Sequence, residues 1–137
     1  MLHEDYLVRM FLALAAAIKD SLMKAKGERD PEGAAELIEV ALANTTDMDG
    51  ALLLKLAPES MVSMLQLSNT DPKLIGYISR SLLLESEYLE DAGQPKKAEL
   101  RKGQALALAD AYGFGMNVAN PEAEVMGFLE AQNLEEE

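Results

Sequence analysis

Four basic residues lie close together in the second half of the chain and could bind an anion or an acidic peptide. They are four of the twelve bases and fall within seven positions: Lys96, Lys97, Arg101 and Lys102. Grouped ammonium and guanidinium groups are typical of such sites. The alternative is that they pair with Glu90 and Asp91, which precede them across the turn at Gly93. The sequence favours internal ion pairs over an anion site, because exposed pairs of this kind are common.

A second candidate site follows one face of the helix expected over residues 72–92. The residues of this stripe recur every three or four positions: Lys73, Tyr77, Arg80, Leu84 and Glu87. An aromatic, an arginine and an aliphatic side chain on one face suit recognition of a peptide. We therefore predict that Tyr77, Arg80 and Leu84 line a partner-binding groove. The alternative is that Tyr77 and Leu84 pack against a neighbouring helix.

Residue types that serve catalysis or bind metals are scarce. The chain has no cysteine and one histidine, His3, so thiolate sites and histidine metal clusters within one chain are excluded. Carboxylates are dense over residues 85–91, but they share a helix with an apolar opposite face and are expected to be solvated. The acidic segment 47–50 lacks calcium-loop ligands at the first and last positions. We expect no enzymatic activity, no metal and no cofactor.

The charge balance limits the classes of partner. The chain has 137 residues with 24 acidic and 12 basic side chains, a formal charge of -12. Seven of the acids lie in residues 103–137, which contain no lysine or arginine. This excess would repel nucleic-acid phosphates. No stretch reaches the roughly 18 apolar residues that a membrane span needs, and Glu4 and Asp5 are unlike a secretion signal. We expect a cytoplasmic protein that binds neither nucleic acid nor membrane.

Proline residues indicate where most helices begin. Four of the five prolines follow Asp, Gln or Asn, and proline suits the first position of a helix. The expected helices cover residues 4–26, 31–43, 58–67, 72–92, 95–112 and 121–131, with a short helical segment over 51–56. β-Branched residues are few and no alternating pattern of useful length occurs. The sequence therefore predicts an all-α fold with about six to seven helices.

An internal similarity links two of these helices. The matched residues, each pair 64 positions apart, are Ala34 with Ala98, Ala41 with Ala105, and Leu42 with Leu106. Both sets follow a long helix that ends in glycine, at Gly27 and at Gly93. The offset is about two periods of a ~34-residue helix-turn-helix repeat. The pattern resembles the second helix of a tetratricopeptide repeat.

A wider resemblance covers about residues 4–112. Two motifs and the alanine-rich second helix carry it: Asp5-Tyr6-Leu7-Val8-Arg9-Met10 and Leu56-Ala57-Pro58-Glu59. Together they resemble an uncharacterised family of small bacterial tetratricopeptide-like proteins, although Ala57 stands where a capping serine is expected. The resemblance implies a tetratricopeptide-like stack of antiparallel helix hairpins and a bacterial origin. It implies no catalytic residue.

These observations predict two parts and one main function. Residues 1–112 form a helical-repeat-like body, and residues 113–137 form a loop, a short helix and an acidic tail packed on or beside it. A stack of hairpins offers a groove for a protein or peptide partner, so we expect an adaptor, a scaffold or a self-associating homodimer. The alternative is a small-molecule carrier or small enzyme that uses carboxylates and tyrosines. It predicts a buried polar pocket with an acid whose pKa is raised.

Overall fold

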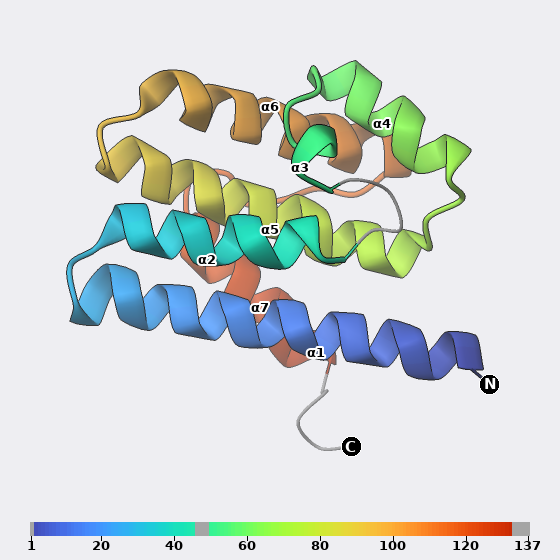
Figure 1. The fold of residues 1–137 in the computed structure, drawn as a ribbon, viewed down its shortest axis with the longest axis horizontal. Helices are drawn as coiled ribbons and strands as arrows, with labels where there is room; N and C mark the ends of the chain where they lie inside the picture. The colour runs from blue at the N-terminus through green and yellow to red at the C-terminus, as the bar shows by residue number, and fades with distance from the viewer. Residues whose placement is uncertain (1, 46–49, 133–137) are drawn as a thin grey trace.

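The computed structural model describes residues 2–45 and 50–132. All regular elements within these residues are helical (Figure 1). In chain order they are α1 (Leu2–Leu22), the π-helical turn η1 (Met23–Gly27), α2 (Pro31–Ala43), α3 (Gly50–Leu53), α4 (Pro58–Leu67), α5 (Pro72–Asp91), α6 (Pro95–Tyr112) and α7 (Pro121–Gln132). The predicted all-α fold is confirmed over these residues. Most of the acidic segment 47–50 and the last acids of the chain lie outside the described residues.

Local sequence signals explain where several helices begin. The Asp30 carboxylate accepts a hydrogen bond from the Gly33 amide at 2.9 Å, and Asp71 accepts one from Lys73 at 2.8 Å. Asn120 accepts from the Ala123 amide at 3.1 Å. Each bond satisfies an amide that the first turn of a helix leaves unpaired. Gln94, the fourth polar residue that precedes a proline, makes no such bond.

Two hairpins, α1–α2 and α5–α6, pack side by side through α2 and α5, and α4 packs on α6 (Figure 1). Their turns differ. Gly93 ends the second hairpin's first helix with φ +78°, a left-handed conformation that favours glycine. In the first hairpin η1 precedes the turn, and the left-handed residue is Arg29, with φ +55°. The first helical run does end at Gly27, as predicted, but only Gly93 supplies the left-handed residue of its turn.

The central helix is α5, and most of its residues are buried against its neighbours. α1 and α2 pack on it from one hairpin and α6 from the other. α7 returns after the segment 113–120 and also packs on α5, behind the layer that α1 and α2 form in Figure 1. Only Pro121 and Val125 of α7 are buried. The fold therefore brings the C-terminal helix onto the face of α5 that carries Tyr77 and Arg80.

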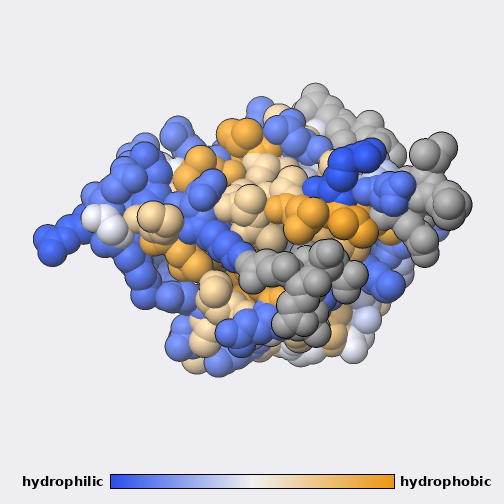
Figure 2. All heavy atoms as spheres, turned by 90° about the horizontal axis from the view of Figure 1, so that it is seen from below, coloured by the Kyte–Doolittle hydropathy of each residue, from blue (hydrophilic) through white to orange (hydrophobic). Residues whose placement is uncertain are grey.

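The outer surface of α1 is partly apolar. Figure 2 views the molecule from the α1 side and shows apolar side chains gathered across the middle of this face. Val8 and Leu12 of α1 are 43% and 45% exposed, and Ala13 and Ala16 of the same helix are exposed as well. No helix of the described residues combines the length and apolar character needed to cross a membrane.

Candidate functional site

Tyr77 joins three helices through ring contacts. Its ring stacks on Phe11 of α1, with centroids 4.6 Å apart and planes inclined by 8°. Phe128 of α7 meets the same ring edge-on, with centroids 4.9 Å apart and planes at 82°. Such pairs add about 0.5–1.5 kcal/mol each beyond the area they bury. We call Gly76, Tyr77 and Arg80 the α5 face, because these residues of α5 contact α7.

Arg80 supplies the polar contacts of the α5 face. Its Nε donates to Oε2 of Glu124 at 2.8 Å, and both side chains are mostly buried. Its guanidinium carbon lies 4.1 Å from the centroid of Phe128 and 4.8 Å from that of Phe114. A guanidinium over aromatic rings gains electrostatic attraction to their faces. One side chain thus fixes both α7 and the segment that leads to it.

Close approach of α7 depends on a glycine. A Cβ atom at Gly76 would lie 3.2 Å from Cζ of Phe128 and 3.3 Å from Nη1 of Arg80, which is tighter than ordinary van der Waals contact. Nη1 of Arg80 also donates to the Gly76 carbonyl at 3.1 Å. The missing side chain therefore leaves the space in which Phe128 and Arg80 meet.

The prediction of an open groove is wrong for two of the three residues. Tyr77 and Leu84 are 1% and 0% exposed, so neither lines an accessible surface. The alternative of packing against neighbouring helices holds, because α5 is covered on several sides and α7 lies over Tyr77. Burial raises the pKa of Tyr77 to about 12, and its hydroxyl has no hydrogen-bond partner among the described residues. Arg80 is the one predicted groove residue that keeps part of its surface.

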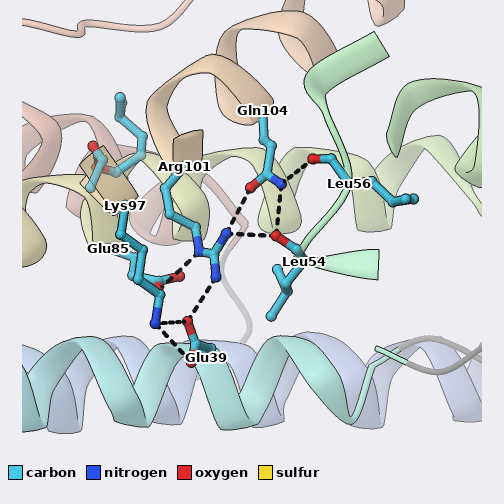
Figure 3. A network of polar contacts seen from close by, with 9 residues as sticks. Glu39, Leu54, Leu56, Glu85, Lys97, Arg101 and Gln104 are labelled. Carbon is cyan, nitrogen blue, oxygen red and sulfur yellow. Dashed lines mark hydrogen bonds and ion pairs between the residues drawn. The ribbon is translucent and has the colours of Figure 1, made fainter. Parts of the chain in front are cut away.

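A second cluster of polar groups surrounds Arg101, which is 3% exposed (Figure 3). Its Nε donates to Glu85 at 3.1 Å and its Nη2 to Glu39 at 2.8 Å. Its Nη1 donates to the Leu54 carbonyl at 2.7 Å and to Gln104 at 3.2 Å. One guanidinium therefore connects α2, α5 and α6 to the end of α3. We call this the Arg101 network.

Gln104 completes the network on the side of the irregular segment. Its amide nitrogen donates to the carbonyls of Leu54 at 2.9 Å and Leu56 at 2.8 Å (Figure 3). These carbonyls belong to the connection between α3 and α4, where no helix satisfies them. Buried carbonyls need such partners, because an unpaired one costs about 1–3 kcal/mol. The network therefore anchors the least regular part of the body.

The two carboxyl groups of the network differ in protonation. Burial and the neighbouring Glu39 outweigh Arg101 and raise the pKa of Glu85 to about 8. Burial also opposes ionisation of Glu39, but hydrogen bonds from Glu85, Arg101 and Lys97 lower its pKa to about 2. These shifts make Glu39 the anion of the network at neutral pH and leave Glu85 protonated. This arrangement avoids two adjacent anions, one of them fully buried.

The predicted anion site is not formed as one surface. Arg101 is buried, and Lys97 pairs with Glu39 at 3.1 Å. Internal pairing is therefore right for these two residues, but their partners are Glu39 and Glu85 rather than Glu90 and Asp91. Lys97, Arg101 and Gln104 share one face of α6, since they are three or four positions apart, and Lys97 lies at its exposed edge.

Lys96 and Lys102 lie on the other side of α6. They are exposed and line a cavity of about 620 Å³. Four acids line the same cavity: Glu87, Glu90, Asp91 and Glu99. The mixture of signs does not favour an anion.

No family model, curated protein or solved structure matches this chain. The function is therefore inferred from the geometry and chemistry of the α5 face and the Arg101 network. The Arg101 network directs its donors to groups of its own chain, so its geometry serves to position helices. The α5 face instead holds a helix through side chains that remain partly accessible, Arg80 and Glu124. It is the better candidate for recognition.

Sequence reasoning missed the α7 half of this site. Glu124 and Phe128 are four positions apart, which places them on one face of a helix, and this spacing was a usable signal. Phe114 lies in the segment before α7, and its place between Gly113 and Gly115 indicated that it folds back on the core but not that it meets Arg80. In the part of the chain that the structure describes, no group of three or more acidic or histidine side chains could hold a metal ion.

Proposed function

We propose that this protein is a protein-interaction module whose α5 face binds a helical segment. The underlying body is a tetratricopeptide-like stack in which α1–α2 and α5–α6 are the two hairpins. The internal similarity supports this arrangement, since Ala34 and its counterpart Ala98 are both buried in the second helix of their hairpin. Leu42 is 4% exposed but Leu106 is 41% exposed, so the two hairpins differ in what covers them.

One observation carries the proposal: α7 is itself a helix bound on the α5 face. Only two of its residues are buried, yet Arg80 contacts it through an ion pair and a ring face, and Tyr77 through a ring edge. Helix recognition in grooves works in this way, with a few anchors spaced along one side of the bound helix. The chain thus displays the mode of binding that a protein or peptide partner would use.

Phe128→Ala is expected to make the α5 face accessible to a peptide added from outside. The substitution removes the ring over Arg80 and against Tyr77, which should weaken α7 binding by about 1.4 kcal/mol or more. A fluorescein-labelled copy of residues 119–132 should then bind the full-length variant at least about 10-fold more tightly than it binds the unmodified chain, because less of the face is occupied. Fluorescence anisotropy measures both affinities.

Two controls accompany this titration. Glu130→Ala changes an exposed residue of α7 and should leave peptide affinity unchanged. A labelled peptide that itself carries Phe128→Ala should not bind either chain. If the normal peptide bound neither the unmodified chain nor the Phe128→Ala chain, the α5 face would not be a recognition surface.

A small-molecule carrier is the second candidate, and one observation favours it. A cavity of about 330 Å³ adjoins the Arg101 network and is lined by Glu39, Lys97 and Arg101 together with apolar residues. Glu85, whose pKa is raised to about 8, is fully buried and does not line this cavity. Burial also raises the pKa of Glu87, which lines the cavity beside Lys96 and a second cavity that includes Tyr88, so the expected pairing of a pocket with a perturbed acid occurs there instead. A metabolite retained by the purified protein in native mass spectrometry would favour this candidate.

Self-association is a further form of the interaction proposal. The apolar outer face of α1, with Val8 and Leu12, could meet a second copy. Light scattering of the purified chain separates a homodimer from a monomeric adaptor.

A further inference from the structure

The contacts of α7 specify the chemistry that the α5 face recognises. Nε of Arg80 takes the Glu124 carboxylate, while the plane of the same guanidinium lies over the Phe128 ring. The two α7 residues are four positions apart, so one turn of helix presents both to a single arginine. Gly76 leaves the space for the ring. The face therefore reads a carboxylate followed, four residues later, by an aromatic ring.

Besides Arg80, the chain holds α7 through the Tyr77 ring, through the buried Pro121 and Val125, and through an ion pair between Lys26 and Glu122. The Lys26 side chain is 66% exposed. Exposed pairs of this kind contribute little. Phe128 and Leu129 are only half-buried. A helix with the same anchors and more buried apolar surface would therefore bind the α5 face more tightly than α7 does.

The connection to α7 allows it to leave without unfolding the body. Residues 113–120 form no helix and begin with Gly113, at φ +75°. Glu124 also accepts a bond from the Asn117 amide at 2.7 Å, so loss of the Arg80–Glu124 contact frees the connection as well. The Arg101 network, which anchors the body, includes no residue of α7.

On the basis of the proposed function, we propose that α7 is a competitor within the chain. Its place is taken by an amphipathic helix of another protein that carries Glu or Asp four residues before Phe. Because α7 is tethered, it acts at a high effective concentration. A partner binds detectably only when its affinity for the α5 face, or its concentration, is high enough to displace the tethered α7. The affinity of α7 for this face therefore sets the partner concentration at which binding begins.

The test uses the full-length chain with two spin labels. The protein has no cysteine, so Ala13→Cys and Glu130→Cys, both at exposed positions, label α1 and α7 alone. Three helical peptides are added: a copy of residues 119–132, a copy with Glu124→Gln, and a copy with Glu124→Ala and Met126→Glu. The last keeps a carboxylate but moves it to two residues before Phe128, onto a different side of the helix.

Pulsed electron resonance then reports the distance between the labels. The unaltered peptide should produce a second, longer distance population that grows with peptide concentration. Both altered peptides should need at least about a 10-fold higher concentration for the same effect. A protein carrying Arg80→Gln, which loses the cation that pairs with the carboxylate, should lose this discrimination between peptides.

Two results would overturn the inference while leaving the proposed function standing. One is peptide binding, seen by anisotropy, without any change in label distance, since α7 would then not compete. The other is equal binding of all three peptides, since the face would then not read the carboxylate–aromatic spacing. Failure of every peptide to bind, to the Phe128→Ala protein as well, would instead remove the proposed function.

Discussion

Replacing Arg101 by methionine is expected to lower the free energy of unfolding by about 3–5 kcal/mol. The substitution keeps much of the side-chain volume but removes every donor that the guanidinium supplies. Glu39 keeps its charge with one partner fewer, and the Leu54 carbonyl loses its shortest bond. Glu39 keeps Lys97 and the Leu54 carbonyl keeps Gln104, but the fully buried Glu85 loses the donor to its Oε2, and such a loss is costly in the interior. Urea denaturation followed by circular dichroism measures the loss.

The matched control is Lys102→Met on the same helix. Lys102 is the next residue and is exposed, so the same change should alter stability by no more than about 0.5 kcal/mol. Arg101→Lys keeps the charge but cannot reach partners on three helices and the Leu54 carbonyl at once, and should lie between the two. Equal urea midpoints for Arg101→Met and Lys102→Met would show that the network does not hold the fold.

The second large effect is a loss of stability as the pH rises. In the folded chain the pKa of Glu85 is about 8, above its ordinary value of 4.5. Between these values the folded chain holds a proton that the unfolded chain releases. The contribution of Glu85 is therefore complete below pH 4.5 and is lost as the pH rises through about 8. Over that interval the free energy of unfolding falls by about 1.4 kcal/mol for each pH unit.

Glu85→Gln should remove this dependence, because the amide cannot ionise and its oxygen can still accept the hydrogen bond from Arg101. Urea denaturation at pH 5, 6, 7 and 8 should show the unmodified chain losing stability at each step and the variant losing far less. Glu99→Gln, at an exposed position of α6, serves as the control. A variant that keeps the slope of the unmodified chain would show that Glu85 is ionised throughout.

Glu39 acts in the opposite direction at low pH. Its folded pKa of about 2 is below the ordinary value of 4.5, so its stabilisation is present above pH 4.5 and lost as the pH falls toward 2. The two carboxyl groups together place the greatest stability contribution of the network near pH 4.5. Arg101 connects both effects, since it bonds to each carboxyl group.

Helix positions could be predicted because their causes are local. Asp30 and Asp71 cap helices from the position next to a proline, and both features are visible in the chain itself. For the Arg101 network, the sequence indicated the position of the arginine but not its partners. Arg101 lies in register with the buried Ala98 and Ala105, which shows that it faces inward. Its partner Glu39 is 62 positions away, so only the folded arrangement, in which α2 and α6 both pack on α5, brings the pair together.

Two residues of the α5 face, Tyr77 and Arg80, could be chosen from the sequence, but the helix that covers them could not. The spacing of Tyr77 and Arg80 marks one side of a helix, but it does not say what covers that side. The covering helix begins more than 40 positions later, and its anchor Glu124 meets Arg80 only in the folded chain. The spacing of residues shows which of them share one face of a helix. It does not show which distant helix packs on that face, because tertiary packing decides this.

Amide hydrogen exchange of the full-length chain tests the central claim, that α7 is a separable helix bound on the α5 face. Amides of α7 around Val125 should exchange through local opening, at least about 10-fold faster than amides of α5 around Leu82. Adding the peptide copy of residues 119–132 should accelerate exchange in α7 and leave α5 protected. Equal protection of α7 and α5, unchanged by the peptide, would show that α7 belongs to one cooperative core and would contradict the account.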